Sequence, residues 1–113
     1  MADVDFKLKD GIYILRPTAT RDLSLQLTRD DLTGLIKKNV KRLPTLVDLG
    51  QVRILQSAGV GLLFFFLIEA QKAGIRVGFF NTSELVMKVL DIAGVQDIAK
   101  VYGNAQEARQ DLA

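Results

Sequence analysis

Apolar and charged residues alternate over residues 4–9, at the start of the chain. Asp10-Gly11 follows, and a second apolar run comes directly after it at 12–15. Two such runs on either side of an Asp-Gly pair are typical of a β-hairpin. Pro17 is expected to end the second strand, because proline lacks the N–H that a strand ladder needs.

Residues 16–27 have no single pattern. Leu23, Leu25 and Leu27 alternate with Ser24 and Gln26. This alternation is compatible with a short extra strand and with an extended loop, so both structures stay open.

Helical spacing begins after Thr28, where the first turn is acidic. The apolar residues that are expected on the buried face, before Pro44 closes the helix, are Leu32, Leu35, Ile36, Val40 and Leu43. A second helix is predicted over 58–73, ending at Gly74. At 100° per residue, the residues that form its core face are Leu63, Phe66, Leu67 and Ala70.

Two further helices are predicted towards the C-terminus. Asn81 and Glu84 have the spacing of a capping box, and the helix that they begin is expected to end at Gly94. The residues expected to face inward are Leu85, Val86, Val89, Leu90 and Ala93. The last helix is predicted over 104–112, again with Asn and Glu three residues apart at its start.

Short apolar runs at 46–49, 75–80 and 98–102 separate these helices and have the length of strands. Strands and helices therefore alternate after the hairpin, which predicts a single α/β domain over residues 1–113. The expected fold is a mixed β-sheet of four to five strands with an N-terminal hairpin, covered by about four helices.

Ser57 lies at the turn between the strand at 46–49 and the longest helix. As an N-cap, its hydroxyl would accept hydrogen bonds from the first backbone N–H groups of that helix. The same amides and the helix dipole also favour a phosphate at this position. Ser57 is therefore either a structural cap or a site of modification.

Composition narrows the function classes. The chain of 113 residues has no cysteine and no histidine, so disulfides, thiolate chemistry and the commonest general base are excluded. A formal net charge of +2 from interspersed signs does not make a nucleic-acid-binding face. The N-terminus lacks a signal-peptide apolar region, and the longest apolar run, 58–68, is too short to cross a bilayer. We expect a cytoplasmic protein without direct membrane insertion.

Motif spacing argues against an enzyme. Gly59-Val60-Gly61 begins like a dinucleotide-binding loop, but Phe64 takes the place of its third glycine. No Gly-Lys-Ser/Thr sequence follows that would form a phosphate-binding loop. Ser57 has no histidine to activate it, and Asp48 and Asp91 are isolated acids. We therefore expect no catalysis, no cofactor and no metal.

Three segments together resemble the STAS domain and, within that superfamily, the bacterial anti-sigma factor antagonists. After the strand at 46–49 comes Gln56-Ser57-Ala58-Gly59-Val60-Gly61, where these antagonists usually read Asp-Ser-Ser/Thr/Ala-Gly-Leu-Gly. Residues 90–98 follow the family's Leu-Asp-x-x-Gly-Leu-x-x-Ile, with valine in place of its second leucine. The match covers residues 45–112. The family's Gly-x-Leu-Asp after the second strand is replaced by residues 16–22, which read Arg-Pro-Thr-Ala-Thr-Arg-Asp.

This resemblance implies a protein-interaction switch in the control of transcription. In the family, the unphosphorylated antagonist binds an anti-sigma factor that is itself a serine kinase, and this frees the sigma factor. The kinase phosphorylates the serine at the turn, and a metal-dependent serine phosphatase resets it. The phosphorylated position falls on Ser57, whereas the acid that usually precedes it is Gln56 in this chain.

The surface around this turn is the expected partner-binding site. Its residues are Gln56, Ser57, Ala58, Gly59, Gly61, Phe65 and Ile68. Gly59 and Gly61 either let a partner approach closely or serve tight helix packing. Phe65 lies opposite the core face of its helix, so we expect it at a partner or self-association interface unless a neighbouring loop covers it. Whether the chain forms a homodimer stays open.

Two other function classes also stay open. STAS domains serve as cytoplasmic subunits of lipid-transport ATP-binding-cassette complexes, and as scaffolds without switching. The bound partner distinguishes the three classes, since it would be a kinase-like anti-sigma factor, a transport ATPase or the protein itself.

Overall fold

The computed structural model of the chain describes residues 4–18, 22–23 and 27–112. Within these residues, five strands form one sheet in the order β1-β2-β3-β4-β5. The strands are β1 Val4–Lys9, β2 Ile12–Pro17, β3 Thr45–Asp48, β4 Val77–Phe80 and β5 Lys100–Val101. β1 and β2 are antiparallel, and the other neighbouring pairs are parallel, so the sheet is mixed as predicted.

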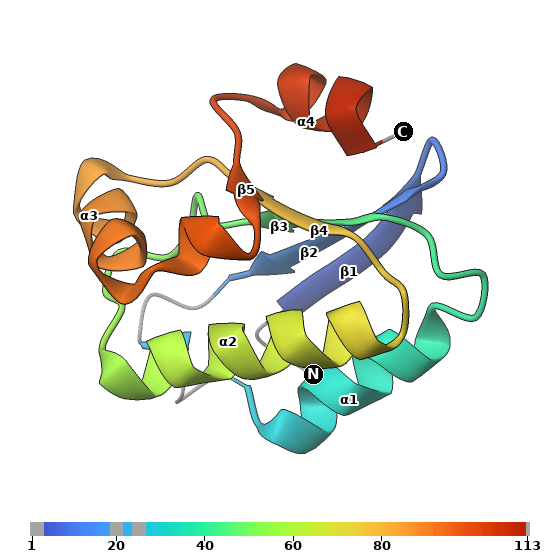
Figure 1. Cartoon of the computed structure of the whole chain (residues 1–113), viewed down its shortest axis with the longest axis horizontal. Helices are drawn as coiled ribbons and strands as arrows, with labels where there is room; N and C mark the ends of the chain where they lie inside the picture. Colours follow the sequence, from blue (N-terminus) through green and yellow to red (C-terminus); the bar gives the residue numbers. More distant parts are fainter. Residues whose placement is uncertain (1–3, 19–21, 24–26, 113) are drawn as a thin grey trace.

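Four helices cover the sheet in the described part of the chain. They are α1 Arg29–Lys38, α2 Ser57–Lys72, α3 Glu84–Ala93 and α4 Ala105–Leu112. Figure 1 shows α1 and α2 on one face of the sheet and α4 on the opposite face. Right-handed crossovers between parallel strands place successive helices on the same face, which explains the shared side of α1 and α2. The predicted fold class is confirmed.

The main hydrophobic core lies between the sheet and the helices of the α1–α2 face. The four residues predicted to form the core face of α2 are all buried: Leu63, Phe66, Leu67 and Ala70. A second, smaller cluster packs α4 against the other face of the sheet. Its buried members are Ile12, Leu46, Phe80, Ala108 and Leu112.

The β1–β2 hairpin has the predicted turn. Asp10 (φ 52°) and Gly11 (φ 79°) both adopt a left-handed backbone conformation. A two-residue turn of this kind matches the twist of the strands that it joins. Lys9 and Ile12 pair directly across the turn, and β2 ends at Pro17 as expected.

The segment between β2 and α1 is described only in part. Asp22, Leu23 and Leu27 are buried. Residues 19–21 and 24–26 lie outside the described residues, so the choice between a short strand and a loop falls outside them too.

α1 begins as predicted but ends earlier. The Thr28 side chain accepts the Asp31 N–H at 3.1 Å, and the Asp31 carboxylate accepts the Thr28 N–H at 2.9 Å. The helix stops before Asn39, because the Asn39 side chain bonds both the N–H and the C=O of Leu43 and closes a turn. Val40, which was predicted on the core face, is therefore 84% exposed.

α3 begins two residues later than predicted. Ser83 is its N-cap, and the Ser83 hydroxyl accepts the Val86 N–H at 3.2 Å. The predicted cap, Asn81, has a left-handed backbone (φ 60°) and its side-chain amide bonds to the end of β3 instead. Val86 is then the first inward residue, and Leu85, which was predicted to face inward, is 63% exposed. The helix ends at Gly94 as expected, with φ 79°.

β4 and β5 are shorter than the apolar runs predicted. β5 has only two residues, because Val95–Asp97 forms a 3-10 turn before it. The N–H groups of Ile98 and Ala99 both bond to the Val95 C=O in this turn. Residues before Lys100 are therefore unable to pair with β4.

The start of α4 agrees with the prediction. The Asn104 side chain accepts the Glu107 N–H at 2.9 Å, and the Glu107 carboxylate accepts the Gly103 N–H at 3.1 Å. Of the helices in the described residues, none is both long and apolar enough to cross a membrane.

Candidate functional site

Ser57 is the first residue of α2, and it is exposed. The N-cap is Gln56, which has an extended backbone (φ −100°, ψ 177°) and accepts the first helical hydrogen bond from the Val60 N–H at 2.9 Å. The prediction that Ser57 caps α2 is therefore wrong by one residue. In the described part of the chain, no group hydrogen bonds to the Ser57 hydroxyl.

Asp22 places a carboxylate at the N-terminus of α2. One Asp22 carboxylate oxygen accepts the Gln56 N–H at 2.8 Å, although 34 residues separate them in sequence. Asp22 is only 5% exposed. The first turn of α2 has no acidic residue of its own, so this carboxylate provides the negative charge that the helix dipole favours there.

Sequence reasoning missed Asp22. It lies in the segment without a regular pattern, and no spacing rule connects it to a turn so far along the chain. The available signal was the departure from the family's Gly-x-Leu-Asp, because the replacement segment 16–22 also ends in an aspartate.

The two glycines of the turn have different environments. Gly59 is buried, and a Cβ at this position would lie 2.6 Å from an Asp22 carboxylate oxygen and 3.0 Å from the Leu55 side chain. Gly61 is exposed, and a Cβ there would have no neighbour within 4 Å. Tight packing therefore explains Gly59, whereas Gly61 leaves the α2 surface open.

Phe65 is less exposed than the helical wheel indicates. The guanidinium of Arg29, on α1, lies over its ring at 5.2 Å from the centroid. α1 therefore covers part of the side of α2 that the sequence places outward, and Phe65 is half-buried. Its contact with a partner stays a prediction.

The exposed part of the predicted surface is continuous along α2. Gly61 follows Ser57 by four residues and Ile68 follows Gly61 by seven, which puts all three on one side of the helix. Ile68 is 46% exposed. Gln56 and Ala58 are exposed beside Ser57, and Ile54, which sequence reasoning did not select, is 48% exposed just before the turn. The site therefore combines a hydroxyl with two exposed isoleucines.

The acids of neighbouring loops have structural partners. The Asp48 carboxylate accepts the Gly50 N–H at 2.9 Å and the Asn81 amide at 3.2 Å, which joins the ends of β3 and β4. Asp91 accepts a hydrogen bond from the Gln96 side chain. Among the described residues, no group of three or more acids is placed to hold a metal ion.

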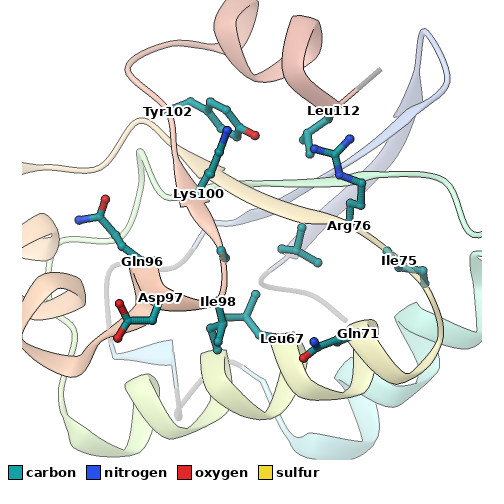
Figure 2. A pocket seen from close by; sticks show the side chains of 12 residues that line it. Leu67, Gln71, Ile75, Arg76, Gln96, Asp97, Ile98, Lys100, Tyr102 and Leu112 are labelled. Atoms are coloured by element: carbon teal, nitrogen blue, oxygen red, sulfur yellow. The ribbon is translucent and has the colours of Figure 1, made fainter.

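A groove of about 380 Å³ lies at the other end of the parallel strands, between the residues that precede β4 and β5. Figure 2 shows Ile98, Leu67 and Gln71 along its lower side, and Arg76 and Lys100 pointing upward towards α4. The two cations thus point away from the lower side of the groove.

Asp111 on α4 engages both cations. Its carboxylate lies 3.6 Å from Arg76 and 3.4 Å from Lys100, and it accepts the Tyr102 hydroxyl at 2.5 Å. The Tyr102 hydrogen bond and then Lys100 hold the pKa of Asp111 below its usual value. Burial, followed by the bond to Asp111, raises the pKa of Tyr102 to about 12. These contacts fasten α4 to the sheet.

The sequence matches the family model of the STAS domain over residues 4–108. This chain belongs to the STAS domain family. The family match includes the hairpin, which the motifs at 45–112 did not reach. A comparison with curated proteins found no significant match.

Solved structures of anti-sigma factor antagonists have the same fold as this STAS domain. A candidate antagonist from Thermotoga maritima superposes with a TM-score of 0.83 at 20% identity, covering 96% of this chain and 93% of that one. An anti-sigma-factor antagonist domain protein from Planctomyces limnophilus has a TM-score of 0.83 at 14% identity, with 97% of each chain covered. The Bacillus cell fate determinant SpoIIAA in its phosphorylated form has a TM-score of 0.70 at 17% identity, covering 97% and 99%. At these identities, the similarity is one of fold.

Proposed function

We propose that this STAS domain is an anti-sigma factor antagonist whose binding to its partner is controlled by phosphorylation of Ser57. The observation that carries this proposal is the exposed Ser57 hydroxyl, which has no hydrogen bond within the described residues and stands at the start of an open helix surface. The fold shared with SpoIIAA, a protein known in a phosphorylated form, supports it.

The domain is the substrate of the switch, and a serine-kinase anti-sigma factor is the enzyme. The kinase transfers the γ-phosphoryl group of ATP to Ser57 Oγ, which loses its proton, and ADP leaves. A metal-dependent serine phosphatase then uses water to release inorganic phosphate and restore the hydroxyl. The domain itself needs no cofactor or metal, and we place this exchange in the cytoplasm.

A phosphate at Ser57 acts on the partner surface more than on the fold. It adds about −1.5 to −2 charges and three acceptor oxygens. The Asp22 carboxylate already bonds the Gln56 N–H at the same helix end. Because the phosphate and this carboxylate are both negative, they repel each other, and the phosphate stays on the solvent-facing side of the turn. There it opposes docking by charge and bulk.

Gln56 changes how a kinase would recognise the turn. The family's acid at this position is replaced by a neutral, exposed side chain. We propose that recognition relies instead on the exposed apolar groups that flank Ser57, namely Ile54, Ala58 and Ile68.

A pull-down from native-host lysate tests the proposal. The baits are the wild type, Ser57→Ala, Ser57→Asp and the control Ser83→Asp, which places the same charge at the start of α3. We expect a soluble kinase-type ATPase to be retained by all except Ser57→Asp. A transport ATPase held by all four baits would contradict the proposal and favour the lipid-transport class.

Amide spectra of the wild type and Ser57→Asp test the mechanism separately. We expect shifts confined to residues around the α2 N-terminus and Asp22. Widespread shifts across the sheet would show that the charge refolds the domain, which contradicts a surface mechanism.

A further inference from the structure

β1 has six residues and lies at the edge of the sheet, and no other strand of the described residues pairs with its outer side (Figure 1). The turn pairs Lys9 with Ile12, and the register continues with Leu8 opposite Tyr13 and Phe6 opposite Leu15. In a two-residue hairpin, the pair that flanks the turn is hydrogen-bonded, and hydrogen-bonded and non-hydrogen-bonded pairs then alternate. Leu8, Phe6 and Val4 therefore belong to non-hydrogen-bonded pairs.

The neighbouring strand confirms this alternation. The Tyr13 N–H donates to the Pro44 C=O at 3.0 Å, on the β3 side and away from β1. The backbone groups of its partner Leu8 therefore point the opposite way, to the outer edge of the sheet. The same holds for Phe6 and Val4. Within the described residues, none of these three residues has another backbone partner.

The side chains along this edge have an antisymmetric charge pattern. The sequence Val4-Asp5-Phe6-Lys7-Leu8 has an acid on one side of Phe6 and a base at the same distance on the other. Reading the strand backwards exchanges the charges and keeps the apolar positions. An antiparallel copy of the strand is therefore complementary to it.

We propose that β1 pairs antiparallel with β1 of a second copy of this chain, in a register centred on Phe6. The residues opposite each other are then Phe6 and Phe6, Val4 and Leu8, and Asp5 and Lys7. Val4, Phe6 and Leu8 are the residues whose N–H and C=O groups point outward, so this register forms hydrogen-bonded pairs at all three positions. The five-stranded sheets of the two copies become one continuous sheet.

The charges select this register over its neighbours. A shift of two residues towards the turn pairs Asp5 with Lys9 but also puts Lys7 opposite Lys7, and a shift the other way puts Asp5 opposite Asp5. Like charges directly opposite each other destabilise a strand pair, whereas Asp5 opposite Lys7 stabilises it twice over in a two-fold dimer. Edge strands often carry lysines that prevent pairing with another chain, but that role needs no acid at a matching position.

The exposed side chains fit this arrangement. Leu8 is 55% exposed, and pairing covers it with the second strand. Asp5 bonds to Arg16 at 2.5 Å on its inner side, and both side chains are exposed. Lys7 of the second copy would approach Asp5 from the outer side, which gives the carboxylate a cation on each flank.

This seam lies apart from the Ser57 surface. β3, from which the chain runs to α2, is two strands away from β1, or about 10 Å across the sheet. The dimer therefore does not depend on the proposed switch, and partner binding in the pull-down does not depend on the dimer.

Sedimentation of charge variants over a concentration range tests the dimer. We expect the wild type to pass from monomer to dimer between about 1 μM and about 1 mM, since a short strand seam is a small interface. Lys7→Asp and Asp5→Lys are each expected to raise the dissociation constant at least about tenfold. An equimolar mixture of the two variants should form a heterodimer, because one chain carries only acids and the other only bases at these positions.

Lys88→Asp, an equal charge change on exposed α3, should dimerise like the wild type. Leu8→Pro provides a second test, because proline removes an N–H that the monomer does not use and that the dimer needs. It should stay folded by circular dichroism and remain monomeric. A wild type that is monomeric up to about 1 mM, or a mixture that does not associate, would overturn the proposal.

Discussion

The Asp22 carboxylate and the Gln56 backbone N–H are joined by a hydrogen bond of 2.8 Å at the start of α2. This bond fixes the Asp22 carboxylate at the N-terminus of α2, whereas the neighbouring Ser57 hydroxyl has no hydrogen bond within the described residues. The residue that supports the site and the residue that is proposed to switch it are therefore different. Variants can separate the two roles.

Removing the Asp22 carboxylate is expected to destabilise the fold. Asp22→Ala should lower the free energy of unfolding by about 1–3 kcal/mol, because it removes a part-buried hydrogen bond to the Gln56 N–H and the buried carboxylate that makes it. Asp91→Ala, at an exposed carboxylate, should change it by no more than about 0.5 kcal/mol. Urea denaturation measures both, and equal effects would contradict a special role for Asp22.

The two turn glycines are expected to respond in opposite directions to alanine. Gly59→Ala forces a methyl group against Asp22 and Leu55, so it should lower the free energy of unfolding by about 1–3 kcal/mol. Gly61→Ala meets open space inside a helix and should raise it by about 0.4–1 kcal/mol. Thermal or urea unfolding of the two variants measures both changes. A stabilising effect of Gly59→Ala would refute the close packing around Gly59.

The two serines at helix starts are expected to differ in the same assay. Ser83→Ala removes an N-cap hydrogen bond and should cost about 1 kcal/mol of stability. Ser57→Ala removes a hydroxyl without a hydrogen bond in the described structure and should change stability by less than about 0.5 kcal/mol. A large loss at Ser57 would restore the view that it is a structural cap.

The Tyr102–Asp111 contact gives the stability of the fold a pH dependence at both extremes. The pKa of Asp111 is lowered in the folded chain, so its contribution is present above its ordinary pKa of 3.8 and is lost as the pH falls through the folded pKa. The pKa of Tyr102 is raised from 10.0 to about 12, so its contribution is complete below pH 10 and is lost as the pH rises towards 12.

Tyr102→Phe tests this contact. The pKa of Asp111 should rise towards its ordinary value in the variant, as measured by NMR titration of the side-chain carboxyl. Tyr13→Phe is the matched control, since Tyr13 stacks on Phe6 and lies away from α4. An unchanged Asp111 pKa in Tyr102→Phe would contradict the hydrogen bond.

Local patterns predicted the elements that depend on neighbouring residues. The Asp10-Gly11 hairpin, the acidic start of α1 and the buried face of α2 follow from spacing within a few positions, and all are confirmed. The errors at Val40 and Leu85 arose where the Asn39 and Ser83 side chains set the helix ends, because capping side chains shift a boundary without changing the apolar period.

The site depends on contacts between distant segments, which no local pattern contains. Ser57 was selected correctly as the first turn of α2, but Asp22 and the cover of Phe65 by Arg29 come from other parts of the fold. The direction of the β1 backbone groups, in contrast, follows from the two-residue turn, and the bond from Tyr13 to Pro44 confirms it.

The phosphate occupancy of Ser57 in partner-bound and unbound chain, both isolated from the native host, tests whether phosphorylation of Ser57 controls partner binding. Mass spectrometry of the two fractions would measure it at Ser57 and, as a control, at Ser83. We expect phosphate on Ser57 in the unbound chain and none in the bound chain. Equal occupancy of Ser57 in both fractions would contradict it.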